Sequence, residues 1–266
     1  MFKIGIVGCG AMGSKVAEEI KSRFRLKAKV VALFDIDESR SKRLSSAIGK
    51  DPLSVGLDEL IRSSDLIIEA SSVSAVKSLV GKAIDAGKDI MVMSSGGLMN
   101  GKAIFDKAAA KRVSIYVPSG ALAGLDGVKA AAIGKIASVT LTTTKPPKGL
   151  QGAPFIVENR IDLSALKKDT VIFEGAALDA VKAFPANVNV AATLSFASSA
   201  PVRIKIIASP GLKRNIHEVE VKGEFGTLTA RTENIPLSDN PRTSTLAFLS
   251  AVRMLQDILG DAGMRS

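Results

Sequence analysis

Three glycines with a characteristic spacing stand near the start of the chain. Gly8, Gly10 and Gly13 form the pattern G-x-G-x-x-G between the apolar run 4–7 and a segment with helical periodicity. In such a turn the first glycine permits a tight bend, the second lets the backbone approach a pyrophosphate, and the third allows close helix–strand packing. The N-terminus of the following helix then faces the anion.

An acidic residue supports a nucleotide site at this turn. Asp35 ends the next apolar run and follows Gly13 at about the 20-residue spacing at which a carboxylate meets the ribose 2′-hydroxyl of adenosine. A carboxylate repels a 2′-phosphate, so Asp35 favours NAD, while the nearby Arg40 leaves NADP open. The sequence therefore predicts a dinucleotide site with these residues: Gly8, Gly10, Ala11, Met12, Gly13 and Asp35. Cys9, with no histidine near it in the pattern, is predicted to be a packed turn residue and not a nucleophile.

Small polar residues follow other predicted strands. Ser71 and Ser72 come after the buried run 66–69, and similar sets stand at 94–97 and 119–121. Ligands of open α/β sheets bind outside the carboxyl ends of the strands, so Ser71 and Ser72 are predicted to line the site of the nicotinamide and its ribose. The alternative is that they are ordinary turn residues.

The single histidine lies in a segment with strict alternation. His217 shares a predicted strand face with Val219 and Val221, while Glu218 and Glu220 face the other way. Imidazole titrates near neutral pH, which suits a general acid/base that moves an amine or hydroxyl proton during hydride transfer. The alternative is a hydrogen-bonded histidine in the core.

The predicted elements that must position these residues alternate between strand and helix in the first half. We expect strands at 3–7, 29–34, 66–69, 90–93 and 114–117, joined by helices at 13–23, 38–47, 74–86 and 101–111. This order is typical of a parallel sheet. After Pro118 the pattern changes to strands at 139–143, 202–208, 217–222 and 226–231 with helices at 179–183 and 188–198, which indicates an antiparallel or mixed sheet. A last helix is expected over 243–259.

The fold class is therefore predicted as α/β, with a Rossmann dinucleotide-binding domain and an α+β second domain. We place the first domain at 1–118, completed by the C-terminal helix 240–266 that packs back on it. The second, substrate and catalytic domain is placed at 119–239.

Composition narrows the function classes. The 266 residues carry a net charge of +10, but only 4% are aromatic and the basic residues are scattered, so nucleic acid is not the expected partner. One cysteine and one histidine exclude a zinc site built from Cys and His, and no metal is expected. A lone cysteine indicates a reducing, cytoplasmic setting. We expect neither a signal peptide nor a membrane span.

Several longer segments together resemble one family, the L-aspartate dehydrogenases. The segments are IGIVGCGAMG, VPSGALAGLDG, LTTTKPP, FPANVNVAATLSFA, NIHEVEVKGEFG and NPRTSTLAFLSAV, which are distributed over most of the chain. FPANVNVAATL followed by NIHE is specific to this family, whereas the glycine pattern alone is not.

The resemblance implies a second domain like that of dihydrodipicolinate reductase, with a mixed sheet. It implies that His217 is the acid/base and that Ala121 and Asn187 contact the cofactor. The implied reaction is the oxidation of L-aspartate to iminoaspartate with NAD or NADP. In reverse it is the amination of oxaloacetate with ammonia, and iminoaspartate feeds pyridine nucleotide biosynthesis. Family members look like homodimers, so a homodimer is expected.

The substrate has two carboxylates, which need cations or amide donors. Lys145, Arg214 and Arg242 are the candidates by proximity to the motifs, and the alternative for each is a solvated surface charge. Two other functions remain open: a related oxidoreductase of another small acid or amino acid, and a non-catalytic dinucleotide sensor.

Overall fold

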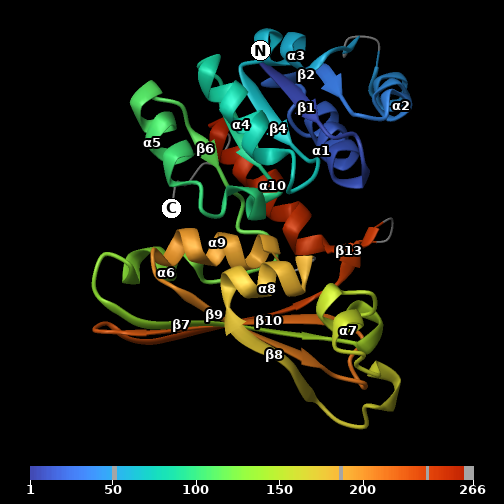
Figure 1. Cartoon of the computed structure of the whole chain (residues 1–266). Helices are drawn as coiled ribbons and strands as arrows, with labels where there is room; N and C mark the ends of the chain where they lie inside the picture. The colour runs from blue at the N-terminus through green and yellow to red at the C-terminus, as the bar shows by residue number, and fades with distance from the viewer. Residues whose placement is uncertain (50–52, 186–187, 238–239, 261–266) are drawn as a thin grey trace. The chain divides into compact units, whose positions relative to one another are not determined.

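The computed structural model describes residues 1–49, 53–185, 188–237 and 240–260, and its contacts divide the chain into two compact units (Figure 1). The first unit contains Met1–Pro118 and the C-terminal segment from Phe248, and the second contains Ser119–Ala247. No helix in the described ranges is long and apolar enough to cross a bilayer.

The first unit is built on a parallel sheet of order β3-β2-β1-β4-β5-β6. Its strands are β1 (Phe2–Val7), β2 (Ala28–Phe34), β3 (Leu53–Ser54), β4 (Leu66–Glu69), β5 (Asp89–Val92) and β6 (Ile115–Tyr116). Its helices are α1 (Ala11–Ser22), α2 (Glu38–Ile48), α3 (Leu57–Ser63), α4 (Val76–Asp85), α5 (Lys102–Lys111) and most of α10 (Thr245–Ile258), with a short helical turn η1 (Ser95–Leu98). This order is that of a dinucleotide-binding α/β fold, so the predicted fold class is confirmed.

The core of the first unit explains why the strands are apolar on both faces. Ile4 and Ile6 of β1 pack in one cluster with Val16 and Ile20 of α1. The helix α10 contributes three residues to the same cluster: Ala251, Val252 and Leu255. On the other face, α3 contacts β1 and β2, and α4 contacts β5. The two helical layers bury the sheet, as parallel sheets require.

The second unit contains a mixed sheet of order β11-β10-β7-β9-β8. Its strands are β7 (Ile136–Lys145), β8 (Thr170–Ala176), β9 (Val202–Ala208), β10 (Asn215–Gly223) and β11 (Gly226–Asn234), and a short pair is formed by β12 (Pro236–Leu237) and β13 (Asn240–Ser244). The helices are α6 (Leu125–Ala131), α7 (Pro154–Glu158), α8 (Ala177–Ala183) and α9 (Val188–Ser198), with short turns η2 (Pro147–Gly149) and η3 (Leu163–Ala165). Only β7 and β9 run parallel, so the predicted mixed sheet is confirmed.

One face of this mixed sheet is buried, and its side chains change from apolar to polar along the strands. The helices α8 and α9 contact the sheet, and α6 contacts α9, so the helices cover one face (Figure 1). Toward one end of that face lie the apolar side chains of Val139, Val202 and Val221. Toward the other end the same strands present Thr143 and His217. A polar cluster therefore sits at one end of an otherwise apolar layer.

The structure differs from the expected elements at several places. Residues 240–244 form the strand β13, so the C-terminal helix begins at Thr245 and the expectation that it begins at residue 240 is wrong. The short elements β3, α3 and α6 were not expected because two to seven residues show no periodicity of their own. The edge strand β8 was also missed, because its residues are intermediate or exposed and lack a clear apolar alternation.

Candidate active site

The three glycines of the turn between β1 and α1 meet three different requirements. Gly8 has φ +96°, and a Cβ there would collide with the carbonyl of Ala70. A Cβ on Gly13 would collide with the carbonyl oxygen of Gly8, so this glycine allows the helix to approach the strand. A Cβ on Gly10 would meet open space, which leaves room for a ligand to approach the backbone.

The N-terminus of α1 completes an anion site at this turn. Gly10 is the N-cap residue, and the first intrahelical bond runs from the Ser14 amide to the Gly10 carbonyl. The amides of Ala11, Met12 and Gly13 precede that bond, and the first turn carries no acidic side chain. These amides and the helix dipole therefore favour a phosphate group here.

Asp35, at the end of β2, is tied to the glycine turn. Its Oδ2 accepts a hydrogen bond of 2.7 Å from the Cys9 amide, and its Oδ1 accepts one of 2.9 Å from the Asp37 amide. The Cys9 side chain is buried. Burial and, second, the charge of Asp35 raise the pKa of the Cys9 thiol to about 12, so it is a packed turn residue and no nucleophile at neutral pH.

Ser71 and Ser72 follow β4 in a turn that a buried carboxylate organises. Glu69 is fully buried, and its Oε1 accepts from both the amide and the hydroxyl of Ser71, at 2.7 and 2.8 Å. Its Oε2 accepts from the amide of Ser94 after the neighbouring strand. The Ser72 hydroxyl lies 3.0 Å from that of Ser74. Glu69 thus links the ends of β4 and β5 through its hydrogen bonds. The Ser71 hydroxyl is used in this network, as a donor to Glu69.

In the second unit, His217 lies on the buried face of β10, as its alternation predicted. It is 6% exposed and faces the same side as Val219 and Val221. Thr143 stands opposite it on β7, and the Thr143 Oγ1 lies 3.0 Å from the imidazole Nδ1. Burial and, second, the positive charge of Lys145 lower the pKa of His217 to about 4. The imidazole is therefore neutral at pH 7 in this structure.

Lys145 lies on the same face of β7 as Thr143, two residues further along. Its side chain is 8% exposed, which is unusual for a lysine and rules out the alternative of a solvated surface charge. Burial lowers the pKa of the ammonium to about 8. No carboxylate of the described ranges forms an ion pair with it. A buried ammonium without a carboxylate partner would be stabilised by an anionic group of a bound ligand.

A small network on β11 holds the turn that contains Ala121. The carbonyl oxygen of Ala121 accepts from the Thr232 hydroxyl at 2.9 Å and from the Asn234 Nδ2 at 3.3 Å. Asn234 Nδ2 also donates to Thr232 Oγ1 at 3.0 Å. Thr232 stands opposite His217 in the sheet, so the Ala121 turn is anchored on the strand next to the histidine.

Of the remaining predicted residues, only the Arg214 side chain lies in the described part of the chain. Arg214 is exposed in the bend just before β10. Arg242 belongs to β13, and its side chain lies outside the described part of the chain, as does the whole of Asn187.

Three polar residues of this face were not singled out in the sequence: Thr143, Thr232 and Asn234. A signal for Thr143 was present, since it stands two residues before Lys145 in an alternating strand and so shares its face. Thr232 and Asn234 have the same spacing on β11. Their placement next to His217 depends on strand order, which the sequence does not contain.

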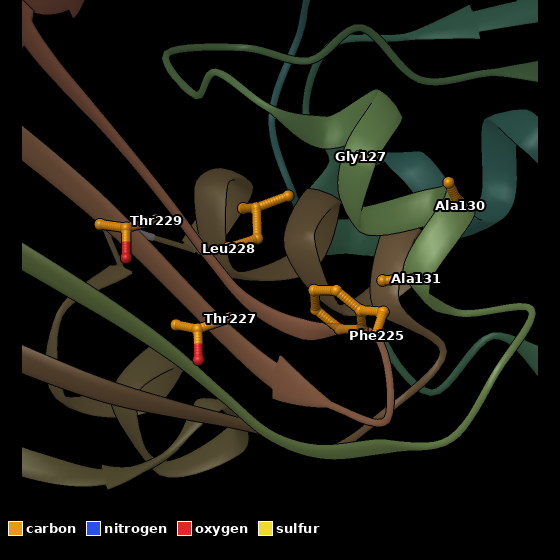
Figure 2. A pocket seen from close by; sticks show the side chains of 7 residues that line it. All are labelled: Gly127, Ala130, Ala131, Phe225, Thr227, Leu228 and Thr229. Carbon is orange, nitrogen blue, oxygen red and sulfur yellow. The ribbon is translucent and has the colours of Figure 1, made fainter.

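A surface pocket of about 630 Å³ lies elsewhere in the second unit (Figure 2). It is lined by Gly127, Ala130, Ala131, Phe225, Thr227, Leu228 and Thr229. None of these side chains titrates near neutral pH. Leu228 is four residues along β11 from Thr232, or about 13 Å at the usual rise of a strand. This pocket is therefore separate from the polar cluster.

Comparisons with known proteins show which families the chain is similar to. The family model "Aspartate dehydrogenase, C-terminal" matches residues 126–258, and "Homoserine dehydrogenase, NAD binding domain" matches residues 8–118. The chain is 47% identical to the L-aspartate dehydrogenase of Methanosarcina acetivorans and 45% identical to that of Methanosarcina barkeri, in each case over 97% of both chains.

Solved structures show the same fold. The crystal structure of aspartate dehydrogenase from Thermotoga maritima matches with a TM-score of 0.73 and 24% identity, covering 100% of this chain and 99% of that one. A homoserine dehydrogenase from Thiobacillus denitrificans matches with a TM-score of 0.63 and 12% identity, over 97% of this chain and 73% of that one.

Proposed function

The chain belongs to the L-aspartate dehydrogenase family, and from this premise we propose how its residues carry out the reaction of that family. It is an NAD(P)-dependent oxidoreductase that acts on the CH–NH2 group of L-aspartate and forms iminoaspartate. In the reverse direction it aminates oxaloacetate with ammonia.

The glycine turn of the first unit fits a dinucleotide. The open space beside the Gly10 backbone and the amides of Ala11, Met12 and Gly13 would accommodate the pyrophosphate, and Asp35 would bind the adenosine ribose. Ala121 and Asn187 are proposed as further contacts, as are Ser71 and Ser72. When bound, the nicotinamide supplies the hydride chemistry by accepting hydrogen from Cα of the substrate.

His217 is proposed as the general acid/base. The Cα–H bond can be oxidised only when the amine is neutral, because an ammonium has no lone pair to form the imine. If Nδ1–H of His217 donates to Thr143 Oγ1, the lone pair of Nε2 is free to accept the proton of the substrate ammonium. The substrate brings two carboxylates, whose negative charge raises the low pKa of His217 toward neutrality. His217 would also activate the water that adds to the imine.

Lys145 is proposed to bind one substrate carboxylate. The charge is buried and its pKa lies well below the ordinary value, so a carboxylate beside it would stabilise the charged form. Arg214 and Arg242 are proposed for the other carboxylate.

The observation that carries this assignment is the buried set formed by Thr143, Lys145 and His217 on one sheet face. The test measures the rate of NADH formation by purified protein with NAD and L-aspartate, and with other amino acids and 2-hydroxy acids for comparison. The same assay is repeated with NADP in place of NAD and with the variant His217→Ala.

Turnover of L-aspartate that is lost in His217→Ala, with cofactor binding kept, is the expected result. Cofactor binding without turnover of any substrate would favour a dinucleotide sensor. Turnover of another compound alone would favour a related oxidoreductase.

The wider setting is also proposed. We assign 1–118 with the C-terminal helix to dinucleotide binding and 119–239 to the substrate. Iminoaspartate would supply pyridine nucleotide biosynthesis, in the cytoplasm, and the protein would be a homodimer. The lone cysteine supports a reducing compartment. The resemblance supports the dimer, which sedimentation analysis tests.

A further inference from the structure

Asn234 carries an unusual buried oxygen at the end of β11. The residue is 2% exposed, and its Oδ1 has no hydrogen-bond partner within the described ranges. A buried carbonyl oxygen without a donor is costly, so such an atom in a native site suggests a donor that arrives with a ligand.

The neighbouring bonds determine which way the Asn234 amide faces. The carbonyl oxygen of Ala121 can only accept, so the amide atom beside it must be the nitrogen. The Thr232 hydroxyl donates its proton to the same Ala121 oxygen, so Thr232 Oγ1 accepts its hydrogen bond from Asn234 Nδ2. Both N–H groups of the amide are thereby used inside the protein. Only Oδ1 remains to bind something else.

The strand register places Asn234 on the same sheet face as His217. Thr232 is opposite His217, and Asn234 is two residues further on the same strand, so the three side chains share one face. Asn234 is thus a diagonal neighbour of His217, at about 7–8 Å between backbone positions. At this spacing, one small polar group placed between the two side chains can contact both.

We propose that Asn234 Oδ1 accepts a hydrogen bond from an N–H group of the substrate amine and, in the reverse reaction, from ammonia. This inference rests on the proposed function and names a specificity residue for it. An amine has enough N–H bonds to donate to His217 and to Asn234 at once. The hydroxyl of a 2-hydroxy acid has one proton and can satisfy only one of the two, so Asn234 selects amino acids over 2-hydroxy acids.

The test compares two variants that loosen the Ala121 turn, of which only one removes the acceptor. Asn234→Ala removes Oδ1 and one bond to Ala121. Thr232→Val removes the other bond to Ala121 and the acceptor of one Asn234 N–H group. It keeps Oδ1, and the remaining bond from Asn234 Nδ2 to the Ala121 oxygen still orients the amide. In reductive amination the KM for ammonia is expected to rise about tenfold in Asn234→Ala, with a much smaller rise in the KM for oxaloacetate. In Thr232→Val the KM for ammonia stays within about twofold of wild type, whatever happens to cofactor affinity.

Three results would overturn the inference. One is an ammonia KM that is the same in Asn234→Ala as in wild type. Another is an equal rise in both variants, which would reduce Asn234 to an anchor of the turn. The third is a rise in the dissociation constant of NADH alone, which would assign the oxygen to the cofactor.

A second variant covers the case in which Asn234→Ala fails to fold. Asn234→Ser keeps a donor for Ala121 but lacks the amide oxygen, and it is expected to show the same rise. Wild-type turnover of L-aspartate is measured in the same series. Its absence contradicts the proposed function itself, whereas normal wild-type turnover with unchanged variants overturns only the role of Asn234.

Discussion

The hydroxyl of Thr143 lies 3.0 Å from the Nδ1 of His217, and both side chains are buried on facing positions of β7 and β10. This bond orients the imidazole ring. A neutral imidazole has one donor and one acceptor, so Nε2 can act as a base when Nδ1 carries the proton and donates it to the Thr143 hydroxyl.

Replacing Thr143 by valine removes the hydroxyl and keeps the shape. We expect kcat with L-aspartate to fall about tenfold, because the wrong tautomer and loosely held rings become populated. The KM for L-aspartate should change much less, and the pH profile of kcat should shift. Thr143→Ser should restore most of the activity. Steady-state kinetics across pH check this, and a valine variant with wild-type kinetics would show that the bond has no catalytic role.

The low pKa of His217 predicts how stability depends on pH. The histidine binds a proton near pH 6.5 in the unfolded chain but only near pH 4 in the folded one. The unfolded state therefore holds more protons between these values, and the free energy of unfolding falls as the pH drops from 6.5 to 4. The contribution is about 3 kcal/mol. Urea unfolding of wild type and His217→Gln at several pH values measures it, since the losses from carboxylates are common to both. Parallel curves would contradict the prediction.

Lys145→Met is expected to separate stability from activity. A buried ammonium without an acidic neighbour opposes folding, so an apolar side chain of similar length should raise the free energy of unfolding at pH 7 by up to about 3 kcal/mol. The same change removes a cation for the substrate, and the KM for L-aspartate should rise at least about tenfold. NADH affinity serves as the control and should stay near the wild-type value. A variant that is less stable, with an unchanged KM, would show that Lys145 serves the fold.

Two alanine substitutions in the glycine turn should behave differently. Gly10→Ala places a methyl group in open space, so the melting temperature should stay near that of wild type while the dissociation constant of NADH rises. Gly13→Ala drives a methyl group into the Gly8 carbonyl, so the protein itself should be destabilised. Thermal unfolding and NADH titration of both variants check this. Equal loss of stability in the two would contradict the assignment of separate roles.

The sequence was sufficient for the parts of the molecule that depend on local pattern. The glycine turn and Asp35 are close in the chain and carry a known spacing, and the alternation around His217 placed it correctly on a buried face. Burial of Lys145 was not visible, because a lysine at the end of a strand has the same sequence pattern whether it is covered or exposed.

Relationships across strands could not be predicted in the same way. Thr143, His217 and Thr232 are far apart in the sequence and meet only because β7, β10 and β11 are neighbours. The bond between Asp35 and the Cys9 amide likewise depends on the exact end of β2. The family resemblance implied His217 and Ala121 as site residues, but not the hydrogen bonds that these two residues form with Thr143, Thr232 and Asn234.

The hairpin that joins β10 and β11 has a consequence for how this protein can change over evolution. Its turn is short, with Gly223 paired to Gly226, which has φ +113°. Because side chains alternate with period two, inserting or deleting one residue in either strand between this turn and the site would move the histidine or its partners to the opposite face. When the change lies in β10 between His217 and the turn, it would also expose Val219 or Val221. Single substitutions should therefore accumulate in this hairpin far more readily than insertions or deletions.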